Sequence, residues 1–213
     1  MLMKVRRMLL ALAAAALPAA ASVPPALAHP HIWITFQARI VHDKGAFVAI
    51  EHTWTFDEFY STMAVEGLDK NQDGVFDREE LAELAKVNVE GLKDFSYFTF
   101  PALAGEKLEL GTPTDYWLEH KDGRLALHFK LPLAKPVLAE AKGLAISVRD
   151  PTYFIAFDPA KTDPVRLSEG APKTCEARIG TPPQASALES LQAQVSPMAP
   201  ATSKAILVEC NGS

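Results

Sequence analysis

The stretch DKNQDGVFDREE at residues 69–80 constrains the fold more than any other part of the chain. An EF-hand calcium loop of twelve residues needs side-chain oxygens at positions 1, 3, 5, 9 and 12, a backbone carbonyl at 7, and glycine at 6. Gly74 stands at the sharp turn, and every ligand position is filled. The candidate ligands are the side chains of Asp69, Asn71, Asp73, Asp77 and Glu80 and the carbonyl of Val75. Because such a loop joins two helices, the pattern predicts a helix–loop–helix that binds Ca²⁺.

The ligand set favours Ca²⁺ over Mg²⁺, because a bidentate glutamate and a seven-oxygen shell suit the larger and more flexible ion. EF-hands usually occur in pairs, and this chain has one such loop. We therefore expect calcium to brace the structure, although a regulatory role stays open. The alternative is a solvated acidic turn that holds no ion.

The residues on both sides of the loop fit this interpretation. Residues 32–41 and 46–56 alternate between apolar and polar side chains around a turn-like HDKG, which predicts a β-hairpin. The period then becomes helical over residues 57–68 and again from 78 to about 89. The first helix begins either with a capping box of Thr55 and Glu58 or with Asp57 as the cap. We therefore expect an EF-hand-like insert over residues 57–90.

Beyond this insert the chain is rich in short strand patterns separated by turn residues, and no internal repeat is visible. A short helix is expected at 185–195, within a Pro/Ala/Ser-rich tail that covers residues 180–213. The fold class predicted is α+β: one antiparallel, β-rich domain over residues 29–179, with the insert after its first hairpin. The expected strands are 95–100, 107–110, 115–120, 124–131, 144–148, 153–157, 175–179 and 205–210.

The first 28 residues are typical of a signal peptide. Lys4, Arg6 and Arg7 precede an apolar run at residues 8–17, and Ala-Leu-Ala ends at Ala28. About 10 apolar residues are too few to cross a bilayer core that needs about 20. We expect cleavage after Ala28, with cleavage after residue 21 as the rival, a periplasmic location, and no lipid anchor.

Removal of that leader shifts the formal net charge from −5 to −8, since it carries three basic residues and no acidic one. An acidic chain without a run of Lys or Arg argues against nucleic acid or anionic lipid as a partner. It is compatible with cation binding.

Cys175 and Cys210 are the two cysteines of the chain. In an oxidising compartment two cysteines most simply form one disulfide. A redox or metal-binding thiol pair is the rival interpretation, but neither a CxxC motif nor a nearby histidine accompanies them.

Cleavage after Ala28 would make His29 the first residue, so that its α-amine and imidazole can bind one metal together. His31 adds a second imidazole. Pro30 has no N–H, which argues against a square-planar site built on deprotonated backbone amides. The remaining donors suit Zn²⁺, Ni²⁺, Co²⁺ or copper. The alternative is that His-Pro-His only leads into a strand.

His52 is the best candidate for a further ligand. A hairpin that closes without irregularity places His31, Trp33 and Thr35 on the same sheet face as His52. The competing interpretation is a packed core histidine. His42, His120 and His128 are expected at the surface.

Several separated motifs resemble one bacterial periplasmic family. They are His29-Pro30-His31, the run from Trp54 to Ser61, the acidic loop, Tyr97-Phe98-Thr99, Leu131-Pro132-Leu133 and the run from Asp150 to Phe154. Together they resemble the family catalogued as domain of unknown function 1007, from about residue 29 to residue 175. The resemblance implies a periplasmic component of a metal transport system, commonly encoded beside a nickel/cobalt-type permease, with one branch that resembles a zinc-acquisition accessory.

The sequence thus predicts a periplasmic metal-binding accessory that delivers or accepts zinc, nickel or cobalt for an inner-membrane permease. The predicted transition-metal ligands are His29, His31 and His52, and Ca²⁺ is the predicted structural ion. The alternative is a calcium-stabilised interaction module without a transition-metal site. An enzyme is not expected, since no Ser-His-Asp set, HExxH motif or pair of catalytic carboxylates stands out. For Asp150 and Tyr153 two interpretations stay open: a functional role, or a structural role in a turn and the strand that follows it.

Overall fold

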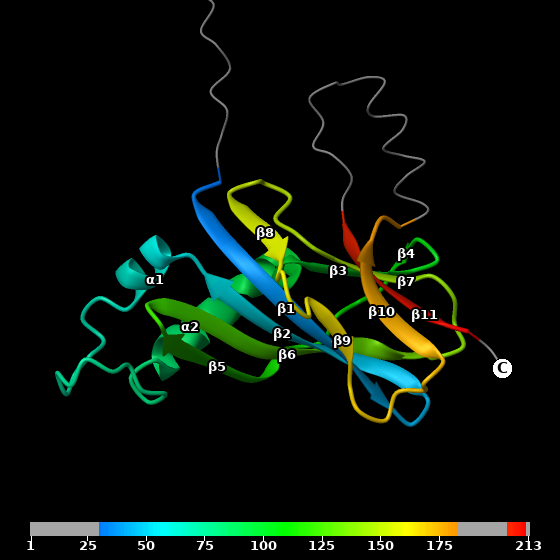
Figure 1. Ribbon diagram of the computed structural model, residues 1–213, viewed down its shortest axis with the longest axis horizontal. Coiled ribbons are helices and arrows are strands. Elements are labelled where there is room, and N and C mark those ends of the chain that lie inside the picture. The colour runs from blue at the N-terminus through cyan, green and yellow to red at the C-terminus, as the bar shows by residue number, and fades with distance from the viewer. Residues whose placement is uncertain (1–29, 183–203, 212–213) are drawn as a thin grey trace, which may run out of the picture.

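Two β-sheets pack face to face, and short helices lie at one end of the molecule (Figure 1). The computed structural model describes residues 30–182 and 204–211. The predicted α+β, β-rich class is confirmed. His29, the leader at 1–28 and the helix expected at 185–195 lie outside the described residues. In the described residues, no helix is long and apolar enough to cross a membrane.

The first sheet has six strands in the order β5-β6-β2-β1-β8, and β9 also pairs with β1. The prediction of purely antiparallel pairing is wrong here, because both β8 and β9 run parallel to β1. The strands are β1 (Ile32–Asp43), β2 (Ala46–Phe56), β5 (Thr114–Lys121), β6 (Arg124–Leu138), β8 (Ile155–Pro159) and β9 (Val165–Leu167).

The second sheet has five strands in the order β10-β11-β7-β3-β4, and its pairs are antiparallel. β7 and β11 occupy the ranges expected from the sequence. The strands are β3 (Thr99–Leu103), β4 (Glu106–Lys107), β7 (Leu144–Val148), β10 (Cys175–Gly180) and β11 (Ala205–Cys210).

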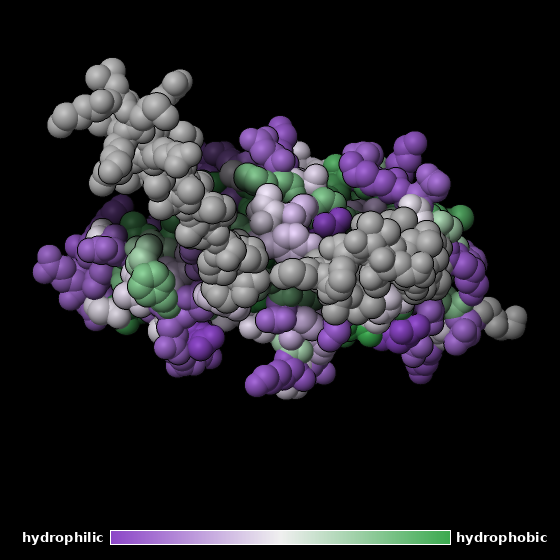
Figure 2. Space-filling view, turned by 90° about the horizontal axis from the view of Figure 1, so that it is seen from above, coloured by the Kyte–Doolittle hydropathy of each residue, from purple (hydrophilic) through white to green (hydrophobic). Residues whose placement is uncertain are grey.

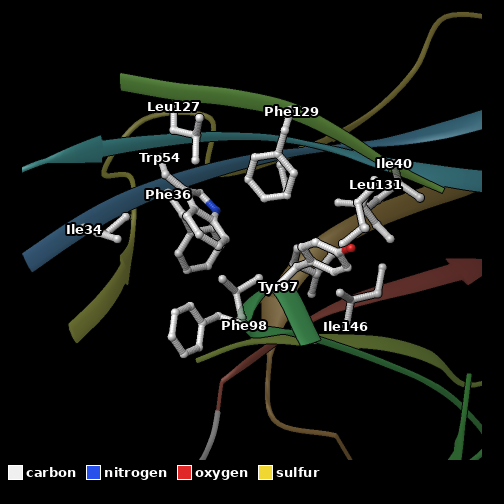
Figure 3. Close-up of a cluster of buried hydrophobic side chains, with 14 of the residues drawn as sticks. Ile34, Phe36, Ile40, Trp54, Tyr97, Phe98, Leu127, Phe129, Leu131 and Ile146 are labelled. Atoms are coloured by element: carbon white, nitrogen blue, oxygen red, sulfur yellow. The ribbon is translucent and has the colours of Figure 1, made fainter. Parts of the chain in front are cut away.

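The core fills the space between the sheets (Figure 3). Alternate residues of β1, β2 and β6 point inward and meet side chains of the second sheet and of the segment before β3. The buried set includes Ile34, Phe36, Ile40, Trp54, Tyr97, Phe98, Leu127, Phe129, Leu131 and Ile146. This one-sided burial leaves the opposite face of the first sheet to polar residues.

Three helical segments follow β2, namely α1 (Glu58–Ala64), α2 (Ala82–Leu92) and the 3₁₀ segment η1 (Lys93–Phe98). Asp57 is the cap of α1, because its side chain accepts a hydrogen bond from the N–H of Tyr60 at 2.9 Å. Both α-helices are shorter at the loop side than the periodicity predicts. The strand expected at 95–100 is wrong over residues 95–98, which belong to η1, where Ser96 and Tyr97 have positive φ angles that no strand allows.

A β-bulge in the first hairpin sets which side chains face the core. Val41 pairs with Ala49, and His42 pairs with Phe47, so that Val48 is left as an extra residue. An extra residue in one strand reverses the facing of every side chain beyond it. His52 therefore lies opposite Ala38 and points into the core.

The predicted disulfide between Cys175 and Cys210 is confirmed by the structure. It links paired residues of β10 and β11, 35 positions apart in sequence. Closing such a loop stabilises a fold by roughly 3–4 kcal/mol in the chain-entropy model. Within the second sheet, the bridge fixes the edge strand β10 to its neighbour β11.

Candidate functional site

The acidic loop at 69–80 joins the turn after α1 to the start of α2, and it lies at the far left in Figure 1. Figure 2 shows hydrophilic surface at the same end. Three side chains of its first half each accept a backbone N–H within the loop. The bonds are Gly74 N–H to Asp69 Oδ2 (3.0 Å), Asp73 N–H to Asn71 Oδ1 (2.9 Å) and Val75 N–H to Asp73 Oδ1 (2.8 Å). Gly74 has φ +79°, a conformation that favours glycine.

The second half of the loop is organised by Asp77. Its Oδ1 accepts the N–H groups of Glu79 at 2.8 Å and Glu80 at 2.9 Å. Glu80 in turn reaches back across the loop, where Oε1 accepts from the N–H of Lys70 at 2.8 Å. Its Oε2 accepts from the N–H of Asp77 at 3.3 Å. The last loop residue thereby connects the two ends of the loop.

Two observations test whether the loop fits a cation. The Oδ1 atom of Asp69 is buried and has no hydrogen-bond partner, which is costly for a carboxylate oxygen unless a positive charge lies beside it. Against this, the carboxylates turn toward backbone N–H groups and do not converge. Within residues 30–182 and 204–211, no group of three or more His, Cys, Asp or Glu side chains is gathered tightly enough to hold a metal. The residue types and their order fit Ca²⁺, and binding requires Glu80 to leave its N–H partners.

The loop holds the edge strand β5 from both faces. Phe76 packs edge-on against the ring of His120, with the centroids 4.8 Å apart. The guanidinium of Arg78 lies 4.8 Å above the ring of Trp117. Residues 117 and 120 point to opposite faces of β5, so the loop contacts that strand on both faces. An ordered loop therefore also covers a sheet edge that would otherwise be open.

His31, at the entrance to β1, is exposed. Its backbone N–H donates to the carbonyl of Phe154 at 2.9 Å, and its ring lies 4.9 Å from the ring of that residue. Since His29 is outside the described residues, the structure leaves the predicted amine and imidazole pair untested.

His52 does not join His31, and the expected shared face is wrong because of the bulge at Val48. His31 is seven positions along β1 from Ala38, the partner of His52, which places the two histidines about 23 Å apart. His52 is 2% exposed, inside the core.

Both ring nitrogens of His52 already have partners. Nδ1 accepts from Trp54 Nε1 at 3.3 Å, and Nε2 lies 3.2 Å from Thr99 Oγ1. The single hydroxyl proton of Thr99 goes to the carbonyl of Tyr97 at 2.9 Å, so Nε2 is the donor to Thr99. Burial lowers the pKa of His52 to about 3. The one lone pair of this neutral ring, on Nδ1, already accepts the hydrogen bond of Trp54, so none is free for a metal, and we assign His52 to the core.

Asp150 is a structural residue at the start of the turn before β8. It is 5% exposed, and its carboxylate accepts N–H groups of Thr152, Phe154 and Ile155 and the hydroxyl of Thr152. These bonds outweigh burial and lower the pKa of Asp150. The turn interpretation of Asp150 is therefore favoured. It holds Tyr153 at the surface, where the residue is 59% exposed.

The outer face of the first sheet carries a polar hollow that the sequence did not indicate. Its volume is about 410 Å³, and it crosses β9, β1, β2, β6 and β5. Within it the ring of His128 stacks on Trp117 at 4.7 Å, and His128 Nδ1 lies 3.2 Å from Thr53 Oγ1. Burial lowers the pKa of His128, and nearby Glu119 partly opposes this. In the sequence each of these residues is a polar residue of a separate strand, and only the pairing of five strands brings them together.

Two curated relatives are similar to this chain. One is an uncharacterized 15.5 kDa protein in the trpE 3′ region of Spirochaeta aurantia, 36% identical over 99 residues, which are 46% of this chain and 70% of that protein. The other is an uncharacterized protein of Haemophilus influenzae, 24% identical over 156 residues, which are 73% of this chain and 74% of that protein. A family model with the description "Protein of unknown function (DUF1007)" matches residues 13–206. Because that match covers most of the sequence, the chain belongs to the DUF1007 family, as the resemblance predicts.

Proposed function

We propose that this protein is an exported accessory protein that binds Ca²⁺ in an EF-hand-like loop and passes a divalent transition metal to or from an inner-membrane permease. The observation that carries the calcium part is the unpartnered, buried Oδ1 of Asp69 within a loop whose every ligand position is filled. The hydrogen bonds of Asp69, Asn71 and Asp73 to backbone N–H groups of the loop order its first half. In this proposal Ca²⁺ is structural: it orders the loop whose residues pack against both faces of β5.

Calcium titration tests this part. We expect one Ca²⁺ per chain, with a dissociation constant no weaker than about 10⁻³ M, the weak end of the extracellular range. Isothermal calorimetry of the mature protein after EGTA treatment and buffer exchange measures it. Failure to bind at that concentration removes the calcium site and leaves a solvated acidic turn.

The transition-metal part now rests on fewer donors than the sequence offered. With His52 in the core, the donors are the α-amine and ring of His29 and the ring of His31. Three nitrogens from residues 29–31 leave coordination positions open, which suits a site that takes up and releases its metal. The exposed ring of His31 supports this role.

The surroundings of His31 support a protein partner. Large apolar side chains are exposed around the start of β1: Trp33 is 49% exposed and Phe154 51% exposed. The backbone N–H of Trp33 donates to the carboxylate of Asp57 at 3.0 Å, so β1 begins next to the N-cap of α1. That helix carries two more exposed apolar residues, Phe59 and Met63. Apolar surface of this kind marks protein interaction sites. We propose that the permease contacts this surface while the histidines exchange the metal.

Three changes at the terminus should weaken Zn²⁺ or Ni²⁺ binding on the order of 100-fold, since each removes or displaces one donor worth a few kcal/mol. They are His29→Ala, His31→Ala and one extra residue before His29. His42→Ala, at the opposite end of β1, is the matched control. Calorimetry in saturating calcium measures the affinities. If the extended variant binds as well as the wild type, the amine is not a ligand. If the wild type binds neither metal, the calcium-stabilised interaction module is the better description.

A further inference from the structure

The hollow on the outer face of the first sheet is crossed by a row of charged side chains. Register places Arg166 of β9 beside Arg39 of β1, Arg39 beside Glu51 of β2, and Glu51 beside Lys130 of β6. Neighbouring strands are about 4.8 Å apart, so these four side chains form a continuous line. All four line the hollow of about 410 Å³.

The carboxylate of Glu51 pairs with two of the three cations in this row. Arg39 Nε donates to Glu51 Oε2 at 2.6 Å, and Lys130 Nζ lies 3.9 Å from Glu51 Oε1. Arg166 has no carboxylate within ion-pair distance among the residues that the structure describes. Two guanidinium groups thus stand next to each other on paired strands. Like charges in this position destabilise a sheet, so an anion between them would be held by both.

Geometry limits what that anion can be. A guanidinium offers two parallel N–H groups that match a carboxylate or phosphate. However, Asp163 and Asp115 also line the hollow, one near each end of the row. Together with Glu51 they equal in number the three cations Arg39, Arg166 and Lys130, so the formal charges of these six side chains cancel. A lining without net positive charge disfavours a compact multiply charged anion. A molecule with one anionic and one cationic group satisfies both charges of the lining.

We infer that this hollow binds a small zwitterionic carboxylate of about the size of a dipeptide. Its carboxylate lies between Arg39 and Arg166, and its ammonium group faces Asp163, which lines the same end of the hollow. Thr53 and Gln37, which also line the hollow, supply polar groups for the part between. The proposed ligand contacts neither a ligand position of the acidic loop nor His31, although Arg78 of the loop lies over Trp117 of the lining. The inference therefore does not depend on the function proposed for the loop and for His31.

The test uses three probes with the mature protein in saturating calcium: the dipeptide Ala-Ala, N-acetyl-Ala-Ala and inorganic phosphate. Backbone amide NMR shifts in β1 and β9 report binding. We expect Ala-Ala to bind with a dissociation constant on the order of 10⁻³ M and the other two probes at least about tenfold more weakly. Preference for N-acetyl-Ala-Ala or for phosphate would show a plain anion site and overturn the zwitterion. Absence of binding by all three would overturn the whole inference.

Arg166→Gln is the decisive variant, with Arg178→Gln of β10 as the matched control. Arg178 pairs with Glu209 at 3.0 Å in the second sheet. We expect Arg166→Gln to weaken Ala-Ala binding at least about tenfold and to leave the melting temperature equal or higher, because it removes a like charge beside Arg39. Lower stability with unchanged binding would assign Arg166 a structural role. Equal loss of binding in both variants would also contradict the site.

Discussion

Glu80→Gln should remove most of the stabilisation that calcium gives to this protein. The substitution replaces a carboxylate that can give two oxygens to the ion by an amide that gives one, and calcium affinity should fall on the order of 100-fold. At a calcium concentration 100 times the wild-type dissociation constant, the ion stabilises the folded state by about 2.7 kcal/mol. Its loss should lower the melting temperature by roughly 5–10 °C for a domain of this size.

Glu79→Gln is the matched control, because it removes the same charge from the neighbouring position, which is not a ligand position in the loop. Calorimetry and thermal unfolding with calcium and with EGTA compare both variants with the wild type. Trp117 fluorescence adds a local signal, since Arg78 of the loop lies over its ring. If EGTA and Glu80→Gln both leave the melting temperature unchanged, calcium does not brace the fold.

The sequence predicts elements well where local chemistry decides them. β7 and β11 occupy the expected ranges, and the tight turn after β5 falls where Asp-Gly predicts it. Asp57 caps α1 because its carboxylate reaches the N–H of Tyr60, a contact that depends only on neighbouring residues. The disulfide was likewise predictable, from the presence of two cysteines and the expectation of an oxidising compartment.

Features that depend on distant strands were not predictable in this way. The parallel pairing of β8 and β9 with β1 joins segments more than 100 residues apart, and no local pattern encodes it. β9 spans only Val165–Leu167, too short for a visible alternation. The bulge at Val48 is a single residue, yet it decides which residues of β1 share a sheet face with His52.

The same distinction applies to the candidate sites. The proposed calcium loop is contiguous in the sequence, so the spacing of its residues alone predicts the ligands. The charged row needs the register of four strands, and Arg39 and Arg166 are unremarkable surface residues until β1 and β9 pair. His52 was included among the predicted metal ligands because a hairpin without the bulge places it on the same sheet face as His31.

The core assignment of His52 leads to a second large expected effect. His52→Ala removes a ring that packs 4.8 Å from Phe129, leaves a cavity, and deprives Trp54 Nε1 of its acceptor. Loss of a large buried side chain together with an unsatisfied donor should cost about 3–5 kcal/mol of the free energy of unfolding. Denaturant unfolding measures it, with His42→Ala, a partly buried histidine of the same sheet, as the comparison. A cost below about 1 kcal/mol would contradict the burial of this ring.

Acid should destabilise the protein through the same residue. Because burial lowers the pKa of folded His52 to about 3, while an unfolded histidine titrates near 6.5, protons bind the unfolded chain more readily. The stability that neutral His52 contributes is therefore fully present above pH 6.5. It is lost as the pH falls from there toward 3, by up to about 1.4 kcal/mol per pH unit. The lowered pKa values of Asp57 and Asp150 reduce the stability only at lower pH. The change in stability between about pH 6.5 and 4.5 therefore reports on histidine.

His52→Gln separates this contribution from that of His128, whose pKa burial also lowers. Glutamine retains a donor and an acceptor for Thr99 and Trp54 but does not titrate. We expect this variant to be less stable than the wild type at pH 7 and to lose less stability between pH 6.5 and 4.5, by about 2 kcal/mol or more. Urea unfolding at each pH gives both quantities. Identical pH dependence in the two proteins would mean that the pKa of His52 is the same in the folded and unfolded states, which contradicts its burial and makes its acceptor nitrogen again a candidate metal ligand.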